Sequence, residues 1–170
     1  MNKFIIVCIV GVLVSCSKKE TVIEEIPFSY GENNAQPNLF SSNDTLILSW
    51  ISSKDKKQGS LYFSQFIDGK WMPPTNVTSG SDWFVNWADF PAVANNGNLI
   101  LTSFLKKSAQ GTYTYDVFLN LQTLTGEKIK KDFLLHTDGI QAEHGFVSMA
   151  PNGEDGFFVT WLDGRNTTKE

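Results

Sequence analysis

Residues 80–90 contain the side chains best suited to bind or cleave a sugar. They place two carboxylates, Asp82 and Asp89, beside two tryptophans, Trp83 and Trp87. A flat indole can cover the apolar face of a sugar ring, and carboxylates accept hydrogen bonds from its hydroxyl groups. Either aspartate could also act as a general acid or base. The alternative is that the tryptophans fill the space between sheets while Asp82 caps a turn.

Glu143 and His144 form a second candidate pair. A histidine beside a carboxylate can shuttle protons or bind a metal ion. Adjacent residues of a strand point to opposite faces, however, and His136 is the only other histidine in the chain. We therefore expect no metal site and no cofactor, and the residue pattern favours a solvent-exposed or loop-ordering role for both residues.

Asp163 and Arg165 follow an apolar segment near the end of the chain. Arg165 is the only arginine, and it is the best candidate to bind an anionic ligand because a guanidinium pairs bidentately with a carboxylate. The alternative is a local ion pair with Asp163, worth at most about 1 kcal/mol if exposed. Glycoside hydrolysis normally needs two positioned carboxylates. If the protein is an enzyme, which the sequence leaves uncertain, the candidates are Asp82 or Asp89 with Glu143 or Asp163.

An internal repeat of about 55 residues supplies the elements that must position these groups. Residues 37–50, 91–104 and 147–161 align with one another. Each contains a short apolar strand, an Asn or Gly turn, and a second apolar strand that ends in Trp or Phe. A repeat at a fixed period indicates an architecture built from similar units.

Each unit has four candidate strands. In the second unit we expect them at residues 90–94, 99–105, 113–122 and 129–136. The third of these alternates apolar and polar residues, as a half-buried strand does. The second strands of the first and third units, residues 46–51 and 157–162, are apolar at nearly every position. That pattern predicts burial of both faces.

These features predict an all-β fold made of β-propeller blades. Four-stranded units of this length, with inner strands between neighbouring sheets, are typical of propellers. A β-sandwich is the alternative, although it does not explain the repeat. In a propeller, the loops after the second and fourth strands of each unit lie at one end. The candidate residues belong to the loops at residues 54–57, 79–89, 106–111, 136–145 and 163–166.

The second repeat, residues 90–101 (FPAVANNGNLIL), resembles the opening of a sialidase-type propeller, where an Arg-Ile-Pro segment precedes an Asn-Gly turn. Residues 159–165 (VTWLDGR) resemble the same strand followed by an acid-x-Arg loop. The resemblance covers residues 37–165 and implies a six-bladed ring. Residues 37–170 suffice for about three blades, so we expect an amino-terminal fragment of a longer protein.

Three features depart from the sialidase pattern. Sialidases hold the substrate carboxylate with three arginines, whereas this chain has only Arg165. The position of the arginine before Ile-Pro is Asp89 here, and residues 64–71 keep the spacing of an Asp-box turn with Phe66 in place of the aspartate. We therefore expect a propeller that binds or hydrolyses glycans, with a non-catalytic glycan- or protein-binding scaffold as the alternative.

Residues 1–15 have the pattern of a secretion signal, with Lys3 before an apolar run from Phe4 to Val14. As a helix this run would rise only ~16 Å, about half of the ~30 Å hydrocarbon core. Residues 13–16 (LVSC) resemble the lipobox of bacterial lipoproteins, which implies cleavage after Ser15 and lipidation of Cys16. An ordinary secretion signal with an incidental cysteine is the alternative.

The lipobox resemblance implies an exported protein anchored by acyl chains on Cys16 to the outer membrane or cell surface. Residues 16–36 are polar and predict a flexible tether before the propeller domain at residues 37–170. A net charge of -4 and a lack of basic clusters argue against binding to nucleic acid. The expected partners are therefore membrane lipid and a glycan.

Overall fold

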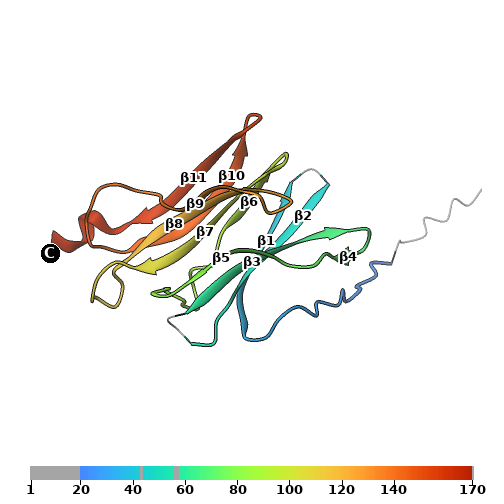
Figure 1. Cartoon of the computed structure of the whole chain (residues 1–170), viewed down its shortest axis with the longest axis horizontal. Helices are drawn as coiled ribbons and strands as arrows, with labels where there is room; N and C mark the ends of the chain where they lie inside the picture. Colours follow the sequence, from blue (N-terminus) through green and yellow to red (C-terminus); the bar gives the residue numbers. More distant parts are fainter. Residues whose placement is uncertain (1–19, 43, 56–57, 170) are drawn as a thin grey trace, which may run out of the picture.

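The computed structural model describes residues 20–42, 44–55 and 58–169, whose regular elements are β-strands and one short 3-10 helix, η1 (Gly164–Lys169). The strands form three antiparallel sheets (Figure 1). The first sheet contains β1 (Asn34–Ser42), β2 (Thr45–Ser52), β3 (Gly59–Ile67), β4 (Lys70–Trp71) and β5 (Thr75–Gly80). The second contains β6 (Val93–Asn96), β7 (Leu99–Lys107), β8 (Tyr115–Thr123) and β9 (Lys128–Leu134). The third contains β10 (His144–Asn152) and β11 (Gly156–Asp163).

The prediction of an all-β fold is confirmed. Every sheet pairs strands that follow one another in the chain, and both β4 and β5 pair with β3. The four strands of the second sheet lie within three residues of the expected ranges at each end. Within the described residues the sheets do not close into a ring.

Tight turns explain why the strands pair as hairpins. The β3–β4 turn contains Asp68 and Gly69 with φ of 50° and 78°, and Gly97 in the β6–β7 turn has a φ of 57°. Two-residue hairpin turns need such positive φ values, which glycine adopts freely and Asp or Asn tolerates. These turns therefore set the register of the strand pairs that they connect.

Strands β6, β7 and β8 of the second sheet are largely buried because this sheet lies between the other two (Figure 1), whereas its edge strand β9 is mostly exposed. Alternate residues of β7 point to opposite faces. Ile100 and Phe104 join the core against the first sheet, whereas Leu101 and Leu105 join the core against the third. The continuous apolar pattern of β7 is thus explained by burial on two sides.

The prediction that both faces of the strand are buried is correct for β2 but wrong for β11. Phe158 and Leu162 of β11 are 61% and 47% exposed. Within the described residues, the third sheet has two strands and packs on the second sheet with one face. Its other face therefore presents apolar side chains to solvent.

The amino-terminal segment joins the first sheet before residue 37. Phe28 lies edge-on against Trp50, with ring centroids 5.0 Å apart, and the Tyr30 hydroxyl donates to the carbonyl oxygen of Trp71 at 3.1 Å. Strand β1 begins at Asn34, inside the segment predicted as a tether. The predicted signal at residues 1–15 and Cys16 lie outside the described residues. Among the residues described, no helix has the length and apolar character needed to span a membrane.

Candidate functional site

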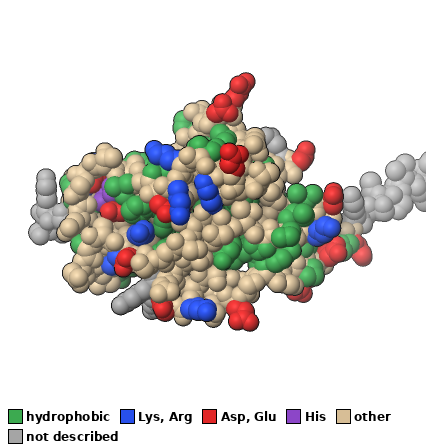
Figure 2. Space-filling model, in the orientation of Figure 1, with side chains coloured by type: hydrophobic (Ala, Val, Ile, Leu, Met, Phe, Trp, Pro, Cys, Tyr) green, Lys and Arg blue, Asp and Glu red, His purple; other side chains and the backbone are tan. Residues whose placement is uncertain are grey.

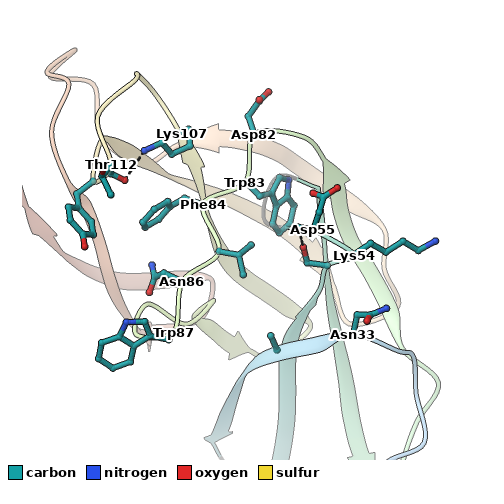
Figure 3. Close-up of a pocket in the computed structure, with 14 residues that line it drawn as sticks. Asn33, Lys54, Asp55, Asp82, Trp83, Phe84, Asn86, Trp87, Lys107 and Thr112 are labelled. Atoms are coloured by element: carbon teal, nitrogen blue, oxygen red, sulfur yellow. Dashed lines mark hydrogen bonds between the residues drawn. The ribbon is translucent and has the colours of Figure 1, made fainter.

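A pocket of about 790 Å³ lies where the β2–β3, β5–β6 and β7–β8 loops meet (Figure 3). Its lining includes Asp55 from the first loop, Trp83 and Trp87 from the second, and Tyr113 from the third. The first and third of these loops follow second strands of the repeat, and the second loop follows β5 at the end of the first unit. Three of the five loops expected at one end therefore meet around this pocket, whereas the loops at residues 136–145 and 163–166 do not line it.

Trp83 forms part of the core as well as the pocket wall. It is 3% exposed and stacks on Phe104 with ring centroids 4.5 Å apart. Gly59 leaves room for the indole, because a Cβ at that position would lie 2.5 Å from Trp83 Cε3. Trp83 thus fills the space between the first and second sheets. This is the second of the two roles that the sequence analysis considered for the tryptophans.

Trp87 has the opposite environment, with 89% of its surface exposed. The Asn86 side-chain oxygen accepts hydrogen bonds from the backbone N–H groups of Ala88 and Asp89, at 2.7 and 2.8 Å. This Asx-type turn bends the loop around Trp87 and holds its indole outward. Tyr113, which is 64% exposed, lines the same pocket and supplies a second accessible ring.

Two carboxylates line the pocket. Asp82 is exposed, accepts a hydrogen bond from the Ser81 hydroxyl at 3.1 Å and points away from the centre of the group in Figure 3. Asp55 accepts the backbone N–H of Gln58 at 2.8 Å. The sequence placed Asp55 in the correct loop but did not single it out, because a loop has no periodicity that indicates side-chain direction. It missed Tyr113 because it put this residue at the start of the strand expected at residues 113–122, whereas β8 begins at Tyr115.

Asp89 is 4% exposed and lies outside this pocket. Both of its carboxylate oxygens accept the backbone N–H of Phe146 at 3.0 Å. Burial raises the pKa of Asp89 to about 6, the hydrogen bond from Phe146 opposes this rise, and the charge of Glu143 adds to it. Phe146 is a bulge residue of β10 with a φ of 51°, so the carboxylate stabilises an irregular strand.

Glu143 accepts a hydrogen bond from the Tyr115 hydroxyl at 2.8 Å. Tyr115 is 1% exposed, and burial followed by this hydrogen bond raises its pKa above the usual range. Glu143 and the adjacent His144 thus have different partners, as expected for neighbours in a strand. The Glu143 carboxylate has a partner in the interior of the protein.

Asp163 and Arg165 form the local ion pair that was the alternative to an anion site. Arg165 Nε donates to both oxygens of Asp163 at 2.9 Å, and its terminal nitrogen contacts Asp163 and lies 3.2 Å from Asp138 Oδ2. The side-chain hydrogen bond from Arg165 holds the pKa of Asp163 well below its usual range. The guanidinium is therefore already paired with carboxylates.

The two histidines meet although they are eight positions apart. His136 follows β9, His144 begins β10, and their rings stack with centroids 3.8 Å apart. Asp116, His136 and His144 bring one ligand atom each to within 4.8 Å of one another, as do Asp138, His144 and Asp163. The sequence placed both histidines in one loop region but gave no sign that Asp116 of β8 would join them.

No protein-family model matches the chain, and neither a curated protein nor a solved structure gives a significant match. The resemblance to sialidase propellers therefore rests on the repeat and its motifs alone.

Proposed function

We propose that this protein is an exported bacterial lipoprotein whose sheets are blades of a sialidase-like β-propeller that binds glycans. The observation that carries the proposal is that two exposed aromatic rings, those of Trp87 and Tyr113, line one pocket. A large aromatic side chain held in solvent by an ordered turn is informative, since such side chains are usually buried.

The stacking of consecutive four-stranded meanders supports a propeller architecture. The second sheet has this form, the first has the meander β1-β2-β3 with both β4 and β5 paired to β3, and β10 and β11 repeat the first hairpin. In a propeller, the exposed apolar face with Phe158 and Leu162 would pack against a further blade.

The pocket chemistry suits a neutral sugar ring. Trp87 and Tyr113 offer flat apolar faces, and Asp55, Asp82 and the backbone of the loops offer hydrogen-bond acceptors. Sugars present both an apolar ring face and hydroxyl donors, so this combination supports glycan binding over binding of a purely apolar ligand.

The positions of the carboxylates favour binding without hydrolysis. Asp89 holds the β10 bulge, Glu143 accepts from Tyr115, and Asp163 is paired with Arg165. Asp82 is the one member of the expected catalytic set that lines the pocket. An exo-glycosidase remains the second hypothesis, with Asp55 and Asp82 as the carboxylates nearest to a bound sugar.

Trp87→Ala tests the glycan proposal. The purified whole chain, in mild detergent, is screened against immobilised neutral and sialylated oligosaccharides, and the best ligand is titrated calorimetrically. Loss of one stacked ring should weaken binding at least about tenfold, equivalent to 1.4 kcal/mol. Phe158→Ala is the matched control, because it removes an aromatic ring that is 61% exposed on β11.

Equal binding by wild type and Trp87→Ala, or no binding to any oligosaccharide, would contradict the glycan proposal. Release of sugar from the same oligosaccharides, abolished by Asp82→Asn, would support the hydrolase hypothesis instead.

Cys16→Ser tests the lipid anchor. Cells expressing the whole chain are fed a labelled fatty acid, and the protein is recovered from membrane and soluble fractions. Wild type and Cys8→Ser should carry the label in the membrane fraction, since the signal containing Cys8 is removed. Persistence of the label in Cys16→Ser would disprove lipidation at this residue.

A further inference from the structure

Two stacked imidazoles and three carboxylates meet at the ends of β8, β9, β10 and β11. His144 and His136 side chains are 0% and 3% exposed. Asp116 Oδ1 lies 3.3 Å from His144 Nδ1 and 3.6 Å from His136 Nε2. Among the described residues, none of the four ring nitrogens has a hydrogen-bond partner. Buried polar atoms without partners are rare and call for an explanation.

Asp138 occupies the other side of both rings. Its Oδ1 lies 3.5 Å from His136 Nδ1, and its Oδ2 lies 3.4 Å from His144 Nε2. His144 Nε2 also lies 3.5 Å from Asp163 Oδ1. His136 Nε2 and His144 Nδ1 are therefore the ring nitrogens that face Asp116.

Two ring nitrogens and one carboxylate oxygen, all buried and without a hydrogen-bond partner in the described part of the chain, thus lie within 4.8 Å of one another. Imidazole nitrogens and carboxylate oxygens are common ligands of metal ions. A cation between the two nitrogens and the Asp116 oxygen would give all three atoms a partner.

We infer that Asp116, His136 and His144 bind a divalent transition-metal ion that connects the second sheet to the third. Ligand atoms about 2.0–2.1 Å from a tetrahedral ion lie about 3.3 Å from one another. The two nitrogen–oxygen distances, 3.3 and 3.6 Å, are close to this value. Two imidazoles and one carboxylate suit zinc, cobalt, nickel or ferrous iron better than calcium or magnesium, which prefer oxygen ligands.

The residues that surround the three proposed ligands are of the kind found around metal-binding histidines in other proteins. Histidine ligands usually donate their second ring nitrogen to a carboxylate, which fixes the ring, and Asp138 is placed to accept from both rings. Arg165 in turn pairs with Asp163 and lies 3.2 Å from Asp138 Oδ2, which offsets the negative charge around the site.

A route to solvent lies next to the site. A pocket of about 360 Å³ is lined by His136, Asp138, Trp161 and Arg165. Figure 2 shows a small area of histidine surface beside acidic side chains at the same end of the molecule as the carboxyl terminus in Figure 1. With three protein ligands, the fourth position of a tetrahedral ion is left for a water molecule.

Metal binding has two structural consequences. The rings are now only 21° from parallel, and an ion in the plane of both rings requires them to tilt apart. Because Asp116 belongs to β8 and His144 to β10, the bound ion cross-links the two sheets and raises their stability by mass action.

The test uses the purified whole chain in mild detergent, stripped of metal and titrated with Zn²⁺ by calorimetry and with Co²⁺ by visible absorption. We expect one ion per chain, a cobalt spectrum typical of four-coordinate N/O ligation, a higher melting temperature, and a change in tryptophan fluorescence because Trp161 lines the adjacent pocket. Asp116→Asn, which keeps the side-chain shape, and His136→Gln should each weaken binding more than 100-fold.

Asp138→Asn should weaken binding by about 10–100-fold, as expected for a residue that positions ligands. Asp68→Asn is the control, because it removes one negative charge from the exposed β3–β4 turn. Circular dichroism establishes that each variant is folded, and the conservative Asp116→Asn decides the question if His136→Gln is not. Absence of stoichiometric binding by the wild type, or equal affinity in the wild type and Asp116→Asn, would overturn the inference.

Discussion

Replacing Asp89 with asparagine should change how the stability of the protein depends on pH. Asp89 is 4% exposed, and both of its oxygens accept the Phe146 N–H at 3.0 Å. The space is tight, because a Cβ on Gly145 would lie 2.1 Å from Asp89 Oδ2. Asparagine preserves the shape and one acceptor oxygen but cannot ionise.

The size of the effect follows from the pKa of Asp89, which burial raises from 3.8 to about 6. The folded state binds this proton more tightly than the unfolded state does. The stabilising contribution is therefore fully present below pH 3.8 and is lost as the pH rises through about 6. At 1.36 kcal/mol for each tenfold change in proton affinity, the loss is about 3 kcal/mol.

The assay is urea unfolding of the whole chain in mild detergent, followed by tryptophan fluorescence between pH 4 and pH 8. The free energy of unfolding of Asp89→Asn minus that of the wild type should increase by about 2.4 kcal/mol across this range, because part of the contribution is already lost at pH 4. Asp68→Asn, on the exposed β3–β4 turn, controls for the loss of one negative charge. A difference that stays constant within about 0.5 kcal/mol would refute the assignment of Asp89 as a buried structural carboxylate.

Three further substitutions test the packing described above by the same unfolding assay. Gly59→Ala should cost about 1–3 kcal/mol, since its Cβ would meet the Trp83 ring at 2.5 Å, and a neutral effect would mean that the indole is free to move. Tyr115→Phe should cost about 1–3 kcal/mol by removing the hydrogen bond to Glu143, whereas an unchanged midpoint would argue against that bond. Phe158→Ser should change stability by less than about 0.5 kcal/mol, and a large loss would show that β11 is covered.

The strands were predictable because their signals are local. Alternation along residues 115–122 and the Gly97 turn each act within a few residues, and both gave the correct elements. Burial was predictable only where another segment covers the strand. The pattern of β11 matches that of β2, but Phe28 packs against Trp50 of β2, whereas none of the described residues covers Phe158.

The candidate site was predictable as a group of loops but not as a set of side chains. Trp83 and Trp87 are four residues apart in one loop, and one is 3% exposed whereas the other is 89% exposed. The difference depends on the space that Gly59 leaves for the Trp83 ring and on the turn that Asn86 forms before Trp87. Only the folded chain reveals these two features. Sequence alone left both tryptophans with the same two alternatives.

By itself, the sequence determined the all-β class, the repeated meander and the end at which the polar loops gather, because strand period and turn chemistry are properties of neighbouring residues. Tertiary structure decided which side chains meet. Asp116, His136 and His144 come from β8, the β9–β10 loop and β10, and their contact depends on how the second and third sheets pack. That packing is a long-range property, which no local pattern of residues encodes.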